Sequence, residues 1–435
     1  MSSIWTQTAS LPQFDPLPHS IKTDVLIIGG GIAGLLCAYR LKEAGVPCVV
    51  AEADRICSGV TMDTTAKITV QHGLIFHKLL REFGPERTKL YLEANKKALE
   101  EYRRLCTAID CDFQTQDSAV YSLNGKQKIE QELEALQKIG YSADFCSQLS
   151  LPFPIDGAVR FSNQAQFHPL KFLREITKDL PIFEQTKVLE LMPWGAVTNH
   201  GTIRAKQIIV TTHFPFLNKH GSYFLKLYQH RSCVLALKHA SPVDGMYVDE
   251  CETGLSFRNY GDFLLLGGGS HRTGKKGGAW QELTAFTQQY YHNATEVSRW
   301  ATQDCMTLDG VPYIGRYSSR TPNLYVATGF NKWGMTSSMV AASLLSDLIL
   351  GKATPYAEVF SPSRTMLRTQ LAINTGESLL NLLTPTAPRC PHLGCALKYN
   401  AQEHSWDCPC HGSRFTEDGK LLNNPATDDN PQKEG

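Results

Sequence analysis

The 435-residue sequence predicts an α/β fold to which a second, antiparallel sheet and a small all-β module are added. Three observations predict it. A strand, a glycine-rich turn and a helix follow one another between Val25 and Glu52, which is the start of a Rossmann-like parallel sheet. A strand-rich interval over about 219–299 indicates an antiparallel sheet. Two short Cys/His loops, at 390–395 and 408–413, indicate a metal centre in the last module.

The turn G-G-G-I-A-G at 29–34 predicts a dinucleotide site. Gly29 makes the turn, Gly31 lets backbone N–H groups approach a pyrophosphate, and Gly34 lets the helix pack closely on the strand. Glu52 ends the next apolar strand and is placed to accept hydrogen bonds from ribose hydroxyls, which disfavours the 2′-phosphate of NADP. The alternative is an ordinary strand–helix turn that is rich in glycine.

Composition favours small-molecule chemistry. The formal net charge of +1 gives no electrostatic footprint for nucleic acid or an anionic membrane. Residues 1–20 form a polar N-terminal extension without a signal-peptide pattern, and the most apolar later segment, 339–350, is too short to span a bilayer. We therefore expect a cytoplasmic protein. Nine of the 13 cysteines are scattered between Cys37 and Cys305, which is typical of thiols in a reducing compartment.

The segment after Glu52 is rich in small and hydroxylated residues, and a helix is expected to begin near Thr65. We expect Thr65 and Lys67 to lie along a bound cofactor; a solvated helix start is the alternative. Further helices are predicted at 86–105, 126–139 and 169–180, and strands at 119–121, 158–160, 182–191 and 207–212.

The second sheet is predicted from strands at 233–237, 255–258 and 263–266. The triple glycine at 267–269 resembles a second dinucleotide loop, but the residues that follow it have no helical pattern. A turn at the end of a strand is therefore the prediction for these glycines.

Two later motifs carry a family resemblance: D-G-V-P-Y-I-G at 309–315, and a strand ending in A-T-G-F that leads to G-M-T at 334–336. With the glycine-rich turn and Glu52, they make residues of about 22–355 resemble FAD-dependent oxidoreductases of the D-amino-acid oxidase type, which include glycine and sarcosine oxidases. The resemblance implies extended FAD, with the last segment near the isoalloxazine ring. It also implies substrates, usually amines or amino acids, that are oxidised at a C–N bond.

The predicted organisation is an FAD-dependent oxidoreductase unit over 21–365, a helix and linker over 366–389, and the metal module over 390–435. FAD-binding parts are expected at about 21–110, 150–218 and 300–360, and substrate parts at 111–149 and 219–299. The candidate FAD-binding residues are Gly29, Gly31, Gly34, Glu52, Ala53, Thr65, Lys67, Val188, Thr211, Thr212, Gly310, Gly329, Gly334, Met335 and Thr336.

The Cys/His loops give C-x-H, a gap of 15 residues, and C-x-x-H. Cys390, His392, Cys408 and His411 resemble the ligands of a Rieske [2Fe–2S] cluster, in which the cysteines hold one iron and the histidines hold the other. A zinc site with the same four donors is the alternative. In high-potential Rieske proteins the cysteines that match Cys395 and Cys410 form a disulfide between the two loops, and the resemblance implies the same here.

Two departures from that family are visible. The highest-potential members have Ser followed two residues later by Tyr, whereas this chain has Ser413 and Phe415, so we expect a lower potential. The module also has no room for strands before Cys390. This abridged module is expected either to take support from the flavin domain or to fail to hold its cluster.

The sequence thus predicts an FAD-dependent dehydrogenase that passes electrons from a small substrate to the cluster and on to a quinone, ferredoxin or cytochrome. Candidate catalytic residues are Arg258, His271 and Lys332, because a substrate carboxylate would need a cationic partner. The rivals are an NADH-fed flavin reductase, which would normally need a second dinucleotide loop, and a redox sensor without catalytic activity.

Overall fold

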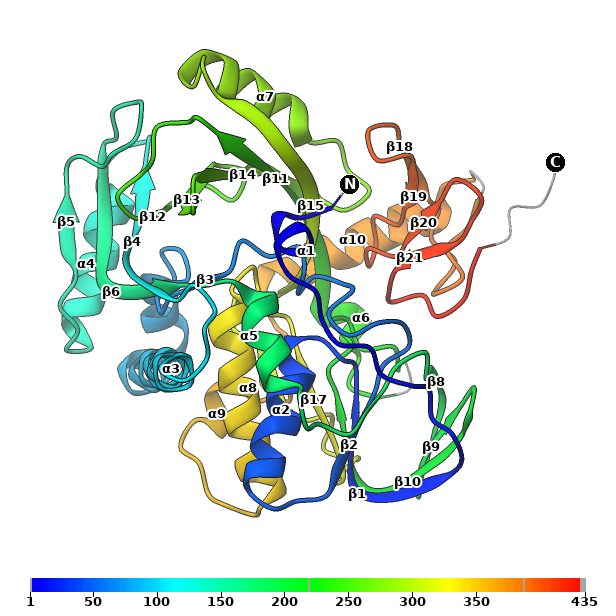
Figure 1. The fold of residues 1–435 in the computed structure, drawn as a ribbon. Coiled ribbons are helices and arrows are strands. Elements are labelled where there is room, and N and C mark those ends of the chain that lie inside the picture. The colour runs from blue at the N-terminus through cyan, green and yellow to red at the C-terminus, as the bar shows by residue number, and fades with distance from the viewer. Residues whose placement is uncertain (1, 218–219, 386–387, 431–435) are drawn as a thin grey trace.

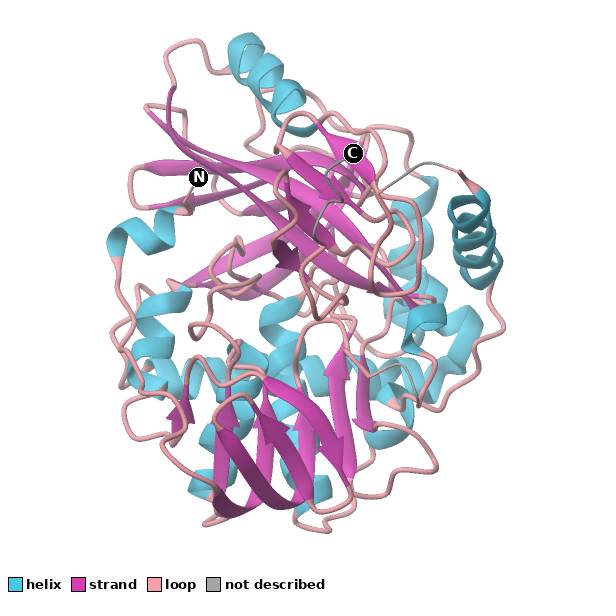
Figure 2. Cartoon of the chain, turned by 90° about the vertical axis from the view of Figure 1, so that its right-hand side faces the viewer, coloured by secondary structure: helices cyan, strands magenta, loops and turns pink. Residues whose placement is uncertain are grey.

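The computed structural model describes residues 2–217, 220–385 and 388–430, and within these residues the strands form three sheets (Figures 1 and 2). In the first sheet the strand order is β16-β17-β10-β1-β2-β7, with the hairpin β8–β9 attached to β10. Its strands are β1 (Ile21–Ile28), β2 (Cys48–Ala51), β7 (Ile182–Phe183), β8 (Val188–Met192), β9 (Gly195–Thr198), β10 (Gly201–Val210), β16 (Tyr313–Arg316) and β17 (Leu324–Thr328). Strands β7, β2, β1, β10 and β17 pair in parallel, which is the doubly wound arrangement that binds ligands at the carboxyl ends of the strands.

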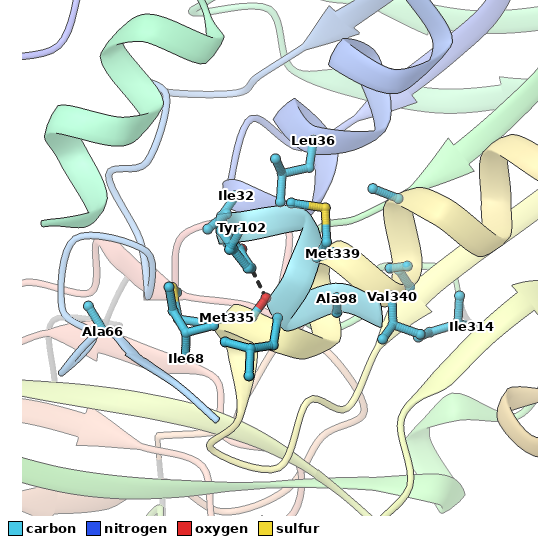
Figure 3. Packing of buried hydrophobic residues seen from close by; sticks show 14 of the residues in the cluster. Ile32, Leu36, Ala66, Ile68, Ala98, Tyr102, Ile314, Met335, Met339 and Val340 are labelled. Carbon is cyan, nitrogen blue, oxygen red and sulfur yellow. Dashed lines mark hydrogen bonds between the residues drawn. The ribbon is translucent and has the colours of Figure 1, made fainter. Parts of the chain in front are cut away.

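Helices pack on this sheet through a continuous apolar core. The main ones are α2 (Ile32–Glu43), α3 (Phe76–Cys106, kinked at Gly84), α5 (Pro169–Ile176) and α8 (Gly334–Ile349). Figure 3 shows Leu36 of α2 beside Met339 of α8, and Val340 of α8 beside Ile314 of β16. The Tyr102 hydroxyl donates to the Met335 carbonyl at 3.0 Å, which ties the first turn of α8 to α3.

The second sheet has the order β15-β11-β14-β13-β12-β4-β6-β3, with β5 paired to β6. Its strands are β3 (Lys67–Ile68), β4 (Gln114–Ser122), β5 (Asp144–Cys146), β6 (Gly157–Gln166), β11 (Leu227–Lys238), β12 (Met246–Asp249), β13 (Ser256–Tyr260), β14 (Phe263–Arg272) and β15 (Thr295–Thr307). Helices α4 (Gln127–Lys138) and α7 (Ala279–Tyr290) accompany it, and short helices occur at α6 (Tyr223–Lys226) and α9 (Ala357–Phe360). The sheet is largely antiparallel and stands over the carboxyl ends of the first sheet's strands (Figure 2).

The C-terminal module consists of α10 (Thr369–Leu383) and a sheet of β18 (Lys398–Asn400), β19 (Ser405–Asp407), β20 (Arg414–Thr416) and β21 (Leu421–Asn423). It lies beside β15, in orange and red in Figure 1. The buried amides of Gln229 and Gln303 donate to its backbone at His411 and Gly412, both at 2.8 Å. The second sheet therefore contacts the short module, in line with the first of the two alternatives expected for it.

Three local predictions differ from the structure. No helix begins near Thr65: residues 67–68 form β3, which pairs with β6, and the helix begins at Phe76. The predicted strand 182–191 is divided into β7 and β8, which lie at different places in the first sheet. The glycines 267–269 lie inside β14, where a Cβ at Gly269 would be 2.4 Å from the Ala279 carbonyl oxygen; their role is to let α7 pack closely on the strand.

The expected division into FAD-binding and substrate parts also differs from the strand pairing. Strand β6 falls within the predicted FAD-binding part 150–218 but pairs with β4 in the second sheet, and β15 continues in that sheet to Thr307. The predicted N-terminal extension packs on the rest of the fold. Its helix α1 (Ile4–Thr8) buries Trp5, whose indole N–H donates to the Thr64 carbonyl. The described residues leave out four parts of the predicted segments: residues 1, 218–219, 386–387 and 431–435.

No helix in the described part of the chain has both the length and the apolar character needed to cross a membrane.

Candidate functional site

A cavity of about 960 Å³ lies between the first and second sheets. Its wall contains every candidate FAD-binding residue except Gly34 and Thr336. Gly34 lies behind the cavity in α2, and Thr336 is buried in α8, where its hydroxyl donates to the Thr69 carbonyl at 3.1 Å. Segments that are far apart in the sequence are therefore brought to one cavity at the carboxyl ends of the parallel strands.

The glycine-rich turn has the geometry that a dinucleotide requires. Gly29 has φ +109°, and a Cβ there would be 2.8 Å from the Thr211 carbonyl oxygen. A Cβ on Gly34 would be 2.0 Å from the Gly29 carbonyl oxygen, so both positions need glycine for the fold itself. A Cβ on Gly31 would meet only Thr61 Oγ1, at 3.3 Å, and Gly31 lines the cavity at the start of α2. This position leaves room for a phosphate beside the positive end of the helix.

Glu52 lies at the carboxyl end of β2, as predicted. Its carboxylate accepts hydrogen bonds from the backbone N–H groups of Gly30, at 2.6 Å, and Asp54, at 2.9 Å. Burial raises the pKa of Glu52, whereas these two hydrogen bonds favour the charged form. The carboxylate is thereby fixed in the cavity wall next to the glycine-rich turn, where it can accept from ribose hydroxyls.

Lys67 on β3 lines the cavity with an ammonium group that has no described anionic partner. Its ammonium group donates to Thr65 Oγ1 at 3.3 Å, and burial together with the nearby Arg258 lowers the pKa of Lys67 to about 7. A buried ammonium with one neutral acceptor is costly, and an anionic or carbonyl group in the cavity would supply the missing acceptors. The turn, Glu52 and Lys67 therefore fit FAD.

Two of the three candidate catalytic residues do not line the cavity. The Arg258 guanidinium is buried under Trp5 and donates to the carbonyls of Thr65, at 2.6 Å, and Ala66, at 2.9 Å. His271 Nδ1 is bonded to the Gly269 carbonyl, at 2.9 Å, on β14. Both differ from the expected substrate contact: Arg258 binds backbone carbonyls just before β3, and His271 is bonded to a backbone carbonyl within β14.

Lys332, the third candidate, does line the cavity, just before α8. Its ammonium group donates to Ser270 Oγ at 3.2 Å and to the Glu252 carbonyl at 3.3 Å. Burial lowers the pKa of Lys332, and Asp304 and Glu252 oppose this effect.

Sequence reasoning missed Asp304, His230 and Glu252, which lie around Lys332. The signal was present in T-Q-D-C-M at 302–306, because alternate residues of a strand face the same side and Thr302, Asp304 and Met306 all line the cavity. His230 stands directly opposite Asp304 in the pairing of β11 with β15, and its Nδ1 is 3.6 Å from Glu252 Oε1.

The four candidate metal ligands come together in the C-terminal module. The rings of His392 and His411 have centroids 5.0 Å apart, and the thiols of Cys390 and Cys408 are close enough to shift each other's pKa in opposite directions. Burial lowers the pKa of both imidazoles, to about 4 for His392 and about 3 for His411, so both are in the neutral form that binds metal. His411 Nδ1 is buried and makes no hydrogen bond with any described residue, as expected of a ligand atom.

The surroundings of these ligands also fit a Rieske cluster. Cys395 and Cys410 form a disulfide that joins the two ligand loops, as the resemblance implies. The Ser413 hydroxyl lies beside Cys390 and lowers the pKa of its thiol, whereas Phe415 is a buried apolar ring in the same cluster of residues. One hydroxyl donor is therefore present beside the sulfurs, and the second is replaced by a phenyl ring.

The two sites share a wall. Leu421, Leu422, Asn423, Asn424, Ala426 and Thr427 of the C-terminal module line the same cavity as the glycine-rich turn. The Ala426 N–H donates to Ser413 Oγ at 3.0 Å, and Ser413 contacts Cys390. Phe214, four residues after the end of β10, lies against the rings of both His392 and His411, with centroid distances of 6.3 and 6.4 Å.

Comparison with known proteins agrees with both sites. Residues 24–348 match the model of the family described as FAD dependent oxidoreductase, and residues 362–433 match the Rieske [2Fe-2S] domain. A Bacillus subtilis protein named putative Rieske 2Fe-2S iron-sulfur protein YhfW is 35% identical, over 97% of this chain and 95% of its own length. Escherichia coli gamma-glutamylputrescine oxidoreductase is 24% identical, over 78% of this chain and 85% of its own length.

Solved structures support the fold of the larger part. L-proline dehydrogenase from P. horikoshii has a TM-score of 0.66 at 17% identity, over 80% of this chain and 98% of that one. Glycine oxidase from Geobacillus kaustophilus also has a TM-score of 0.66, at 19% identity, over 79% and 99% of the two chains. The cofactors that follow from the two matched families are FAD and a Rieske [2Fe–2S] cluster.

Proposed function

Because the chain belongs to the FAD dependent oxidoreductase family over residues 24–348 and carries a Rieske [2Fe–2S] domain over residues 362–433, we propose that it oxidises a small amine or amino acid and delivers the electrons through FAD to the cluster. A one-electron carrier such as a quinone, a ferredoxin or a cytochrome then accepts them from the cluster.

The chain's own residues have separate tasks in this proposal. Gly31 and the first turn of α2 bind the pyrophosphate, and Glu52 binds the ribose hydroxyls. Lys67 and the segment from Gly329 to Met335 border the isoalloxazine ring. When bound, FAD supplies a centre that takes up two electrons together and releases them singly.

The observation that carries the proposal is the shared wall of the two sites. Residues 421–427 of the cluster module border the FAD cavity, and one of them, Ala426, is hydrogen-bonded to the serine that contacts Cys390. Phe214 adds a second connection, from the residues after β10 to both cluster histidines. This proximity favours electron transfer between the centres over two independent functions.

An anaerobic substrate screen with two readouts tests the proposal. Amines and amino acids are added to the purified protein, the flavin is followed by its absorbance, and the reduced cluster is followed by its EPR signal. We expect the flavin to bleach with at least one amine or amino acid and the cluster signal to appear in the same sample. Bleaching by the substrate without any cluster signal would overturn the relay.

NADH in place of the substrate tests the rival reductase. Fast bleaching by NADH would favour a reductase, although no second dinucleotide loop occurs in the described chain, because glycines 267–269 lie inside β14. Metal analysis decides between iron and zinc at Cys390, His392, Cys408 and His411. Zinc at this site would leave a flavoenzyme without a relay, and failure of all amines and amino acids to bleach the flavin would favour the sensor.

A further inference from the structure

The cavity face of the second sheet carries a compact group of charged and titratable side chains. Asp304 on β15 and His230 on β11 are directly opposite in the strand pairing, so their side chains lie on the same face. Glu252 follows β12 and Lys332 precedes α8. This group lies where the second sheet stands over the FAD cavity.

Asp304 is the unusual member of the group. It lines the cavity, yet its carboxylate makes no hydrogen bond and no ion pair with any residue that the structure describes. Burial raises the pKa of Asp304 to about 6, with Lys332 and Arg231 opposing the shift, so the ionised form predominates at pH 7. A buried, ionised carboxylate without a hydrogen-bond or ion-pair partner lowers the stability of the folded state, unless a bound ligand compensates its charge.

Three arginines of the second sheet bind groups outside the cavity. Arg258 is bonded to backbone carbonyls, Arg231 pairs with Glu403 of the cluster module, and Arg272 donates to the carbonyls of Pro409 and Cys410, both at 3.2 Å. None of the three lines the cavity.

In the described chain the single arginine of the cavity wall is Arg55, which pairs with Glu184 at 3.2 Å near the glycine-rich turn. Among the described residues, no arginine beside Asp304 could therefore bind a substrate carboxylate in a bidentate way.

The net charge of the group is negative. Lys332 contributes one positive charge, Asp304 and Glu252 contribute two negative charges, and burial lowers the pKa of His230 to about 3, which keeps that imidazole neutral. A cation gains from this field and a carboxylate is repelled by it.

We infer that Asp304 binds the ammonium group of the substrate, and that the substrate is an alkylamine without a carboxylate on the carbon that bears the nitrogen. The inference rests on the proposed function, since it names the substrate class of the same site. It narrows the two substrate classes, amines and amino acids, to the first.

Two small probes differ only in whether the carbon that bears the nitrogen carries a carboxylate. In tert-butylammonium the carbon that bears the nitrogen carries three methyl groups, and in 2-aminoisobutyrate one of these is replaced by a carboxylate. Neither compound has a hydrogen on that carbon, so neither is oxidised. Titration calorimetry on the FAD-loaded protein at pH 7 measures binding without turnover. We expect tert-butylammonium to bind more tightly, by about tenfold or more.

Variants assign this preference to Asp304. Asp304→Asn is expected to weaken tert-butylammonium binding by about tenfold or more and to leave the neutral analogue tert-butanol unaffected. Glu250→Gln is the matched control, because Glu250 also lines the cavity but is paired with Lys128 at 2.6 Å, and it should leave binding of both probes unchanged. FAD content and melting temperature confirm that each variant is folded.

Equal or tighter binding of 2-aminoisobutyrate to the unmodified protein overturns the inference, and this measurement needs no variant. Unchanged tert-butylammonium binding in Asp304→Asn also overturns it. The proposed function fails separately: in that case the probes bind as expected, yet no amine reduces the flavin and the cluster.

Discussion

The phenyl ring of Phe214 lies edge-on against the imidazole of His411, with ring centroids 6.4 Å apart and ring planes at 74°. The same ring meets His392 at 77°, so one aromatic side chain contacts both histidines of the cluster site. Phe214 belongs to the flavin domain and is fully buried, and its neighbours Thr212 and His213 line the FAD cavity. Phe214 therefore connects the wall of the FAD cavity to both histidines of the cluster site.

Phe214→Leu should remove both ring contacts while keeping most of the apolar volume. We expect the free energy of unfolding to fall by about 1–2 kcal/mol. The EPR spectrum of the reduced cluster should change because the imidazoles lose their packing, and flavin-to-cluster transfer in stopped-flow measurements should slow. The control is Phe183→Leu, which lies in the same apolar cluster without touching a histidine. Identical transfer rates in both variants would contradict a role for Phe214.

Gln229→Leu tests the support that the second sheet gives to the module. The Gln229 amide donates to the carbonyls of His411, at 2.8 Å, and Asn424, at 2.9 Å, and both would lose a buried donor. We expect a loss of about 1–3 kcal/mol in stability and less iron per polypeptide. Gln166→Leu, at a buried glutamine of β6 that contacts Gln114 instead, should leave the iron content unchanged. Full iron occupancy in Gln229→Leu would show that the module does not depend on this contact.

Gly31→Ala should separate cofactor binding from folding. The added methyl group would meet only Thr61 Oγ1 and would project into the cavity. The stability of the FAD-free protein should change by less than about 0.5 kcal/mol, whereas FAD affinity should fall by about tenfold. Gly34→Ala is the contrasting variant, since its Cβ would be 2.0 Å from a carbonyl oxygen and should prevent folding. Unchanged FAD affinity in Gly31→Ala would place the pyrophosphate elsewhere.

Phe415→Tyr should raise the reduction potential of the cluster. A phenol at this buried position beside the ligand loops would donate a hydrogen bond, which stabilises the more negative reduced cluster. A hydrogen bond of about 1 kcal/mol corresponds to a shift on the order of 40 mV for one electron. Redox titration followed by EPR measures it, and a potential of the unmodified protein at the top of the Rieske range would contradict the argument.

The stability of the FAD-free protein should depend on Asp304 in a pH-dependent way. Burial raises the pKa of Asp304 from 3.8 to about 6, so the folded state holds this proton more tightly than the unfolded state. The unfavourable contribution is therefore absent below about pH 4, grows between pH 4 and 6, and is complete above pH 6. Asp304→Asn should be more stable than the unmodified protein at pH 7, by on the order of 2 kcal/mol, and equally stable at pH 4. Urea unfolding at the two pH values measures the difference, and an equal gain at both would exclude titration of Asp304 as its cause.

The sequence by itself determined the chemistry that depends on local spacing. The glycine-rich turn between a strand and a helix, Glu52 at the end of the next strand, and the two Cys/His loops are each short segments. Because their geometry is set within a few residues of chain, the parallel sheet, the dinucleotide site and the clustered metal ligands could be predicted.

The tertiary structure decided everything that depends on which segments meet. The sequence predicted Arg258 as a partner for a substrate carboxylate. In the folded chain Arg258 lies under Trp5 and donates to the carbonyls of Thr65 and Ala66. Strand alternation alone could place Asp304 on the cavity face. Its lack of a described hydrogen-bond partner could not be predicted, because it depends on how β11, β15 and the turn before α8 meet. The contact of Phe214 with two histidines that lie 178 and 197 residues later in the chain arises only when the module docks on the second sheet. Long-range packing, which local patterns do not encode, determines these positions.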